Sequence, residues 1–320
     1  MNESSTKIDL GTHALRVREA WERSVREGRE HTDEMRIRRA DGEARWHLAR
    51  VLPLTDDVGR VLGWFGTATD IHERRIAALA EEVLANIGAA TVTEPDAAAL
   101  VSAIAACLVP ALGDYCVVDI RVDDERVERL AARHADPERA EDMRLALSFG
   151  PRSIHDNHPA ARVMRTGEAE IVERAPESFG PRLGRDAAAR EVLARLNPRA
   201  YLALPLRAQG RVIGTLSLLT SGDGHEFTTE EVALAEEAAR RTALAVSNAR
   251  LNERTREAEQ LYRTLLDAVP QVVWLAGPKG GAFYYNRRWR EYTGDSEGSG
   301  RPASEFVFPE DLPVIAERWK

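Results

Sequence analysis

Two cysteines and a few histidines are the side chains of this 320-residue chain best suited to chemistry. Cys107 and Cys116 could act as redox thiolates, which requires a lowered thiol pKa and access to solvent. Both stand in apolar segments, so we expect buried and inert thiols. Two cysteines are also too few for a disulfide framework or a zinc cluster, so we expect a protein of the reducing cytoplasm with no metal site.

His155 is the residue best placed to hold a haem, because neutral imidazole is a common iron ligand. A solvent-facing loop histidine is the simpler interpretation of the same residue. His72-Glu73 begins a charged segment but lacks the Arg-Thr-Pro continuation of a histidine-kinase phosphoacceptor box. The sequence also shows no Walker motif, cyclase signature or Ser/His/Asp arrangement, so we expect the chain itself to be non-enzymatic.

The bulk composition narrows the class of protein. The chain is 43% hydrophobic and 30% charged, which is typical of soluble globular domains. Its net charge of −8 disfavours binding to nucleic acid or to an anionic membrane. No apolar run approaches the roughly 20 residues of a membrane span, and the polar first residues do not form a signal peptide.

The first quarter of the chain predicts a helix followed by a three-stranded meander. Leu15, Val17, Trp21 and Val25 have helical spacing within residues 14–27. Strands are expected over 34–38, 46–50 and 61–69, joined by turns at Asp41-Gly42 and at Asp57-Val58-Gly59. Residues 72–90 then return to helical periodicity.

The middle of the chain mixes helices with antiparallel strands. We expect a helix from Pro95 to Leu108 and a half-buried strand over 114–122 with Cys116 on its apolar face. Residues 123–150 read as helical or irregular. A strong hairpin is expected over 199–219 around Gln209-Gly210, followed by a helix from Thr229 to Val269 capped by Thr228 or Thr229. These patterns predict an α+β fold with antiparallel sheets.

The segment YLALPLRAQGRVIGTLSLL at 201–219, the helix that follows it and the strand DYCVVDIRV resemble GAF domains. The resemblance covers about half the chain and implies a ligand pocket. Cyclic-nucleotide GAF domains carry an Asn-Lys pair where this chain has Thr220 and Ser221, which disfavours that ligand. Bilin is disfavoured because no cysteine accompanies His155 or His158, the histidines in the region where such domains attach the pigment. One GAF branch reduces free methionine sulfoxide with cysteine thiolates, and it remains a minor alternative.

Residues 270–294 resemble the opening strands and helix of Trp-rich PAS domains, on Trp274, Asn286, Trp289, Tyr292, Thr293 and Gly294. The resemblance implies that Asn286 caps the helix of Trp289 and that Trp274 and Trp289 border a ligand cavity. Core packing is the alternative role of the two tryptophans. A photoreactive cysteine is missing from the relevant helix, so flavin chemistry of the blue-light type is excluded.

Residues 40–75 resemble the closing hairpin and exit of a PAS domain. Asp70-Ile71 stands where such domains hand over to a signalling helix, and an aspartate held by an arginine there would couple sheet to helix. We take Asp70 and Arg74 as the candidate pair. An ordinary strand end with a charged helix start is the alternative.

The resemblances imply three parts: the C-terminal half of a PAS domain at 1–75, a GAF domain with flanking helices at 76–252, and a linker helix with the N-terminal half of a second PAS domain at 253–320. Leu244, Leu251, Ala258 and Leu265 recur every seven residues, which favours a helix-mediated homodimer. The candidate ligand-binding residues are Trp274, Asn286, Trp289, Cys116 and His155, and the candidate transmission residues are Asp70, Arg74, Leu244, Leu251 and Leu265.

The expected function is a sensory module of a bacterial multi-domain sensor. It would bind a small ligand or partner and pass the signal through its helices to an output domain outside this chain, a histidine kinase of a two-component system. The alternative is a free-standing interaction protein whose PAS halves complement each other. The identity of the ligand or cofactor stays open.

Overall fold

The computed structural model describes residues 10–40, 44–94, 96–184, 186–221, 227–278, 282–295 and 303–318. It has an α+β fold with antiparallel sheets, as the sequence predicts. The chain divides into two compact units, Met1–Asn248 and Ala249–Lys320.

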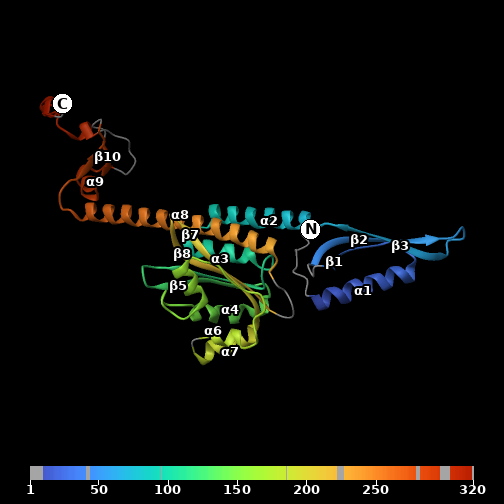
Figure 1. Cartoon of the computed structure of the whole chain (residues 1–320). Coiled ribbons are helices and arrows are strands. Elements are labelled where there is room, and N and C mark those ends of the chain that lie inside the picture. The colour runs from blue at the N-terminus through green and yellow to red at the C-terminus, as the bar shows by residue number, and fades with distance from the viewer. Residues whose placement is uncertain are drawn as a thin grey trace. The chain divides into compact units, whose positions relative to one another are not determined.

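The N-terminal part is a helix followed by a meander (Figure 1). Helix α1 (Leu10–Glu27) precedes β1 (His31–Arg38), β2 (Ala44–Thr55) and β3 (Val61–Asp70), which pair antiparallel in the order β1-β2-β3. The carboxylate of Asp56 accepts hydrogen bonds from the backbone N–H groups of Val58 and Arg60, which closes the predicted turn with Gly59 at a φ of 83°. The other predicted turn, Asp41-Gly42, lies outside the described residues.

The two faces of this sheet differ in how they are covered. Trp21 of α1 packs edge-on against Trp64, with 5.1 Å between the ring centroids. Phe65, the neighbour of Trp64, must face the other way because side chains alternate along a strand. Phe65 is 54% exposed and its cross-strand partner Leu52 is 37% exposed. The face opposite Trp64 therefore leaves apolar side chains open to solvent.

The central part begins with α2 (His72–Thr93) and α3 (Ala97–Leu108). The side chain of Asp96 caps α3 by accepting from the N–H of Ala99 at 2.8 Å. Strands β4 (Tyr115–Arg121) and β5 (Val127–His134) follow, then short helices η1 (Pro137–Arg139), α4 (Ala140–Ala146), η2 (Leu147–Phe149) and α5 (Pro159–Thr166). The remaining elements are β6 (Glu170–Val172), α6 (Phe179–Leu183), α7 (Ala187–Leu196), β7 (Pro198–Ala208), β8 (Arg211–Ser221) and α8 (Thr229–Ala268).

These strands form one antiparallel sheet in the order β5-β4-β8-β7-β6. Helices α2, α3 and α8 lie on one side of the sheet, and α4, α6 and α7 lie on the other (Figure 1). Both faces are therefore buried. The side chains of β4 illustrate this, because Cys116 and Val118 are 0% exposed while Tyr115 and Val117, which alternate with them, are 2% and 8% exposed.

Two predictions from sequence are wrong in this sheet. Residues 114–122 were expected to form a half-buried strand, but β4 is buried on both faces because helices cover each side. Residues 123–150 were expected to be helical or irregular, yet they contain β5. In the run VERLAARH two charged residues are adjacent and three apolar residues follow, so charged and apolar residues do not alternate and the strand signal is weak. The strand also lies at an edge of the sheet.

The predicted hairpin and long helix are confirmed. Gln209 and Gly210 both have positive φ, 50° and 76°, as a tight hairpin turn between β7 and β8 requires. At the start of α8, Thr228 and Glu231 form a reciprocal capping box, with Oγ1 of Thr228 accepting from the N–H of Glu231 at 3.2 Å and the carboxylate of Glu231 accepting from the N–H of Thr228 at 3.0 Å. The helix ends at Ala268, one residue before the expected Val269.

Helix α2 is long and apolar enough to cross a membrane by length and composition, although only 17% of the relevant window is buried. Its buried residues Val83, Ile87 and Ala90 lie four and three residues apart, on one face of the helix. Helix α2 also contacts α3 of the central part. An amphipathic helix that packs on a soluble domain passes the same length and hydropathy test, so this feature is weak support for a membrane span.

After the second half of α8, the described part of the C-terminal unit contains a small hairpin and three short helical elements. Strands β9 (Trp274–Ala276) and β10 (Ala282–Tyr285) pair antiparallel, and α9 (Arg287–Thr293), η3 (Ala303–Phe306) and α10 (Leu312–Arg318) follow. Asn286 caps α9 by accepting from the N–H of Trp289 at 3.1 Å, as predicted.

Candidate functional site

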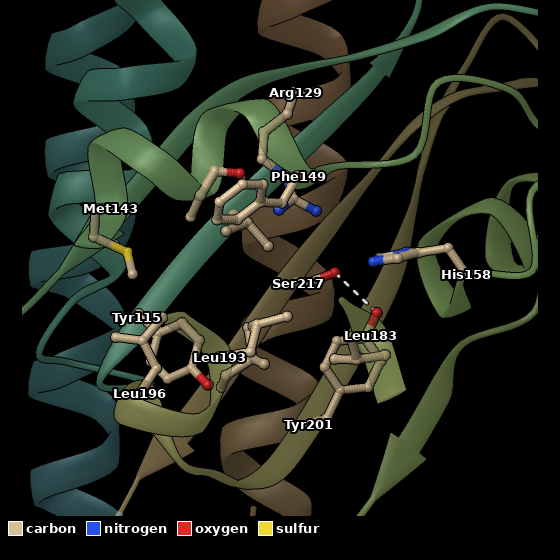
Figure 2. A pocket seen from close by; sticks show the side chains of 13 residues that line it. Tyr115, Arg129, Met143, Phe149, His158, Leu183, Leu193, Leu196, Tyr201 and Ser217 are labelled. Atoms are coloured by element: carbon tan, nitrogen blue, oxygen red, sulfur yellow. Dashed lines mark hydrogen bonds between the residues drawn. The ribbon is translucent and has the colours of Figure 1, made fainter. Parts of the chain in front are cut away.

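The cavity of the central part lies on the side of the sheet covered by α4, α6 and α7 (Figure 2). Strands β4, β7 and β8 supply its floor, and the helices supply its walls. The volume open to the centres of water-sized molecules is about 40 Å³. The apolar residues that line it are Val117, Met143, Ala146, Phe149, Leu183, Leu193, Leu196 and Leu219.

Tyr115 of β4 provides a hydroxyl that has no hydrogen-bond partner within the described part of the chain. The residue is 2% exposed, and its ring stacks on His134 at 5.6 Å between centroids. Burial, with a smaller contribution from Asp114, raises the pKa of this phenol well above its usual value. The hydroxyl is therefore neutral and available as a donor.

Tyr201 and Ser217 form a second polar point of the cavity. Their hydroxyl oxygens are 3.2 Å apart across the paired strands β7 and β8 (Figure 2). Burial also raises the pKa of Tyr201, so this pair stays uncharged. Two strand residues earlier, the hydroxyl of Thr215 donates to the carbonyl of Ala160 at 3.0 Å, which ties α5 to the sheet beside the cavity.

His158 points from the N-terminus of α5 toward the Tyr201–Ser217 pair (Figure 2). Its Nδ1 accepts a hydrogen bond from the N–H of Ala160 at 3.1 Å, which caps the helix. Burial, reinforced by the nearby charge of Arg129, lowers the pKa of His158 to about 4. The ring is thus neutral at pH 7, and because Nδ1 accepts, we assign the proton to Nε2.

Arg129 is the charged residue in the lining, and its charge is already compensated. Its Nε and Nη2 donate to the two carboxylate oxygens of Asp119 at 2.8 and 3.0 Å, and Nη1 donates to the carbonyl of Ala146 at 3.2 Å. The side chain of Asp119 is 0% exposed. Gly150 packs against this pair, and a Cβ there would lie 2.9 Å from both side chains. The pair therefore closes one side of the cavity without presenting a free charge.

The cavity thus offers apolar surface and neutral donors. It holds none of the groupings of three or more His, Cys, Asp or Glu that could bind a metal ion, and the described residues as a whole contain none. Such a lining suits a small molecule recognised by burial and by one or two hydrogen bonds.

The structure places Cys116 and His155 away from this cavity. Cys116 alternates with Tyr115 and Val117 and so faces the opposite side of the sheet, where burial, with a smaller contribution from Asp119, raises its thiol pKa. Burial also raises the pKa of Cys107 on α3. His155 is exposed, and its N–H donates to Oγ of Ser153 at 3.1 Å. The cavity histidine is therefore His158, three residues further on.

The candidate residues of the C-terminal unit make packing and capping contacts. Oδ1 of Asn286 also accepts from the N–H of Val273, and its Nδ2 donates to the carbonyls of Leu266 and Gln271. Trp289 is 8% exposed, with Tyr285 stacked on it at 4.5 Å and Phe306 edge-on at 5.4 Å. Trp274 is 45% exposed. The polar groups of Asn286 are thus committed to the fold.

The predicted junction between sheet and helix uses different arginines. Asp70 accepts from the N–H of His72 at 2.9 Å and pairs with Arg45 of β2 at 2.9 Å, and these contacts lower its pKa. Arg74 is exposed on α2. Its neighbour Arg75 makes the contacts back to the sheet: it pairs with Glu34, and its guanidinium lies 4.0 Å from the ring centroid of Trp46.

The candidate transmission residues on α8 form an exposed stripe. Leu244 is 61% exposed, Leu251 47% and Leu265 55%. The buried residues of α8 all precede residue 247. The second half of the helix therefore projects apolar side chains into solvent.

Sequence reasoning missed Tyr115, Arg129, Tyr201 and Ser217 as cavity residues, and it considered His158 beside His155 but selected only His155. Two signals were present in the chain. His158-Pro159 has the pattern of a helix start, with proline at the first helical position. The strands carry polar side chains in otherwise apolar runs, which marks positions where a buried hydroxyl needs a partner.

Comparison with known proteins places these parts in two domain families. The model described as "GAF domain" matches residues 96–246, and the model described as "PAS fold" matches residues 6–76. A curated relative, the peroxide stress-activated histidine kinase mak1 of Schizosaccharomyces pombe, is 39% identical over 57 residues. That stretch is 18% of this chain and 4% of the kinase, so the chain spans a small part of this relative.

Similar solved structures include the three that follow. The GAF domain of a phosphoenolpyruvate-protein phosphotransferase from Coxiella burnetii is 19% identical, with a TM-score of 0.43 over 55% of this chain and 98% of that one. A free methionine-R-sulfoxide reductase from Neisseria meningitidis is 20% identical, with a TM-score of 0.40 over 58% and 96%. The GAF domain of a putative sensor histidine kinase from Pseudomonas syringae pv. tomato is 18% identical, with a TM-score of 0.38 over 57% and 97%.

The chain therefore contains a PAS-fold segment at residues 6–76, followed by a GAF domain at residues 96–246.

Proposed function

We propose that this chain is a signal-transmitting module in which a small molecule in the GAF cavity alters the helices that leave the domain. The observation that carries the proposal is that the strand lining the cavity, β8, is followed in the chain by the helix that leaves the domain, α8. Ser217 and Leu219 of β8 line the cavity, and the next helix in the chain, α8, is buried in its first half and exposed in its second. A change in the sheet would thus reach α8 directly.

The PAS-fold segment provides a second point of coupling, at its exit into α2. Arg45 of β2 pairs with Asp70, which lies two residues before α2. Arg75 in the first turn of α2 pairs with Glu34 of β1. A shift of these strands would move the helix start, because the charged contacts are short and directional. We propose Asp70, Arg45 and Arg75 as the transmission residues of this junction.

The output we propose is a histidine kinase domain outside this chain, and the working assembly is a homodimer formed through the stripe on α8. The relative mak1 is named as a histidine kinase, which supports the proposal over the short stretch that it matches. The GAF and PAS families supply soluble domains, which supports a cytoplasmic location.

We propose that the chain has no catalytic activity of its own. A methionine sulfoxide reductase of the GAF type would need reactive thiolates at its pocket, but Cys116 faces away from the cavity, and burial raises the thiol pKa of both cysteines. Raised pKa values leave little thiolate at neutral pH. The measurement is the turnover of free methionine sulfoxide by the full chain. We expect no turnover above that of the control variant Cys107→Ser/Cys116→Ser, which has no thiols.

A second candidate function is a free-standing interaction protein whose PAS halves complement each other. The exposed apolar residues of both partial units favour it: Leu52 and Phe65 on the N-terminal sheet, and Trp274 and Phe283 in the C-terminal hairpin. Exposed apolar sheet surface promotes association between chains. If the chain is such an interaction protein, Phe65→Lys should abolish association between chains. If it is a sensory module, association should instead depend on α8.

The test of the sensory proposal fills the cavity by mutation. Ala146 is 5% exposed and lines the cavity, so Ala146→Leu occupies part of its volume without a ligand. We expect changed hydrogen exchange in residues 251–268 of α8 as well as in the GAF domain. Ala77→Leu, at an exposed position on α2, is the control. Exchange changes that stop within the GAF domain would contradict transmission along α8.

A further inference from the structure

The hydroxyl of Tyr115 is the cavity feature that the fold itself does not explain. A phenol that is 2% exposed and lacks a hydrogen-bond partner destabilises the fold relative to one that has a partner. Buried polar groups in native proteins nearly always have a partner, so each exception calls for a ligand, a water or a functional role. Because Tyr115 lines the cavity, a molecule bound there can supply the missing acceptor.

The second donor of the cavity is the imidazole of His158. Its Nδ1 is occupied as an acceptor by the N–H of Ala160, so the neutral ring presents Nε2–H toward the interior (Figure 2). Both Tyr115 and His158 therefore donate and carry no charge. The matching group on a ligand is a hydrogen-bond acceptor.

The charged residues near the cavity argue against an ionic ligand. Arg129 makes two hydrogen bonds to Asp119, so its charge is compensated before any ligand arrives. An anion would meet the Asp119 carboxylate behind the guanidinium, and a cation would meet the guanidinium. Moving an uncompensated charge into such an apolar site is costly.

The size of the cavity sets a further limit. A volume of about 40 Å³ open to the centres of water-sized molecules corresponds to roughly three waters. This is room for a small organic molecule, and a nucleotide or a tetrapyrrole would require the walls to separate.

We propose that the GAF cavity binds a small uncharged molecule that has an apolar body and an acceptor such as a carbonyl oxygen, to which Tyr115 donates. His158 is the second donor for a ligand with a second acceptor. The inference rests on the proposed sensory function and names the ligand class for that site.

The test uses three probes that share one ring: cyclopentanone, methylenecyclopentane and cyclopentanecarboxylate. The first two have the same shape and differ in the acceptor, and the third adds a negative charge. Binding to the full chain is followed by NMR titration. We expect cyclopentanone to bind about fivefold or more tightly than methylenecyclopentane, as one neutral hydrogen bond allows, and the carboxylate to bind most weakly.

The variant Tyr115→Phe isolates the contribution of the hydroxyl. It should reduce the affinity for cyclopentanone to about that for methylenecyclopentane, and leave the latter unchanged. Without a ligand, removal of an unpartnered hydroxyl should leave the stability unchanged or raise it. Tyr262→Phe, at a 67% exposed position on α8, is the matched control.

Three outcomes overturn the ligand class: equal affinity for the ketone and the alkene, tighter binding of the carboxylate, or no binding of any probe. A loss of stability in Tyr115→Phe combined with no binding would show that ordered water satisfies the hydroxyl, which also overturns it. The Ala146→Leu experiment measures transmission without any ligand. A wrong ligand class and a failure of the sensory function are therefore distinguishable.

Discussion

His158 connects the chemistry of a single side chain to the stability of the GAF domain. Its folded-state pKa is about 4, below the ordinary value of 6.5, because burial and the nearby Arg129 disfavour the charged form. Asp119, Asp156 and Glu170 act in the opposite direction with smaller effect. Between pH 6.5 and 4 the unfolded chain therefore binds more protons at this residue than the folded one.

Stability contributed by a neutral His158 is present above pH 6.5 and is lost as the pH falls toward 4. The shift corresponds to about 3 kcal/mol at most, and we expect about 2 kcal/mol because the residue as a whole is only half-buried. The variant His158→Asn keeps an acceptor for the N–H of Ala160 and does not titrate. It should therefore weaken the loss of GAF stability between pH 7 and pH 4.

The measurement is the urea concentration at which peptides covering β4 and β8 lose hydrogen-exchange protection, at several pH values. Tryptophan fluorescence does not report on this domain, because the six tryptophans lie outside residues 65–273. His155→Asn is the matched control, since His155 is exposed. Equal pH dependence in the wild type and His158→Asn would contradict a buried neutral histidine.

The residues of the cavity were the part least accessible from sequence. Tyr115 and Cys116 are adjacent, and the choice of Cys116 followed from treating the strand as buried on one face. Helices cover both faces of β4, so either residue could have been the one at the cavity, and only the position of the short helices α4 to α7 decides between them. These helices are too short for hydrophobic periodicity in the sequence to predict which face of the sheet they cover.

At the scale of elements, the junction between β3 and α2 shows that two adjacent arginines can have different roles. Arg74 and Arg75 are adjacent, and the helix turns successive residues by about 100°. Arg75 thereby faces the sheet, where it pairs with Glu34 and lies over Trp46, whereas Arg74 faces solvent. Sequence could identify the exit, but the direction of each side chain depends on where the helix begins.

Removing the guanidinium of Arg75 should loosen the start of α2. A cation–π contact of this kind contributes roughly 0.5–1 kcal/mol, so Arg75→Met should speed hydrogen exchange of residues 72–76 about two- to fivefold. The emission of Trp46 should also change. Arg74→Met removes the same charge from the adjacent position and should alter neither. A similar effect of both variants would mean that helix charge, and not the contact with the sheet, governs this junction.

Elements with strong local signals were predicted well from sequence. The β7–β8 hairpin has two apolar strands around Gln209-Gly210, and α8 begins with a capping box of Thr228 and Glu231. Strand β5 follows β4 after a short connection, and it was missed because its charged and apolar residues do not alternate. Turns and caps could therefore be predicted from nearby residues, whereas the edge strand β5 could be recognised only once its pairing with β4 was known.

At the scale of the whole molecule, the question is how the exposed stripe on α8 is covered. Leu251 and Leu265 are 47% and 55% exposed, and with Leu244 and Ala258 they keep a seven-residue spacing. A lone helix that exposes such a stripe gains by pairing with a second copy, since each buried leucine contributes about 1.5–3 kcal/mol. The chain should therefore form a parallel dimer through residues 244–265.

The variant Leu251→Lys/Leu265→Lys places two charges on this seam and should convert the dimer to a monomer. The measurement is sedimentation equilibrium of the full chain over a range of concentrations. Asn252→Lys/Gln260→Lys adds two lysines to other faces of the same exposed segment and should leave the dimer intact. A dimer that survives the seam variant but dissociates with Phe65→Lys would instead assign association to the open N-terminal sheet, and with it the interaction-protein function.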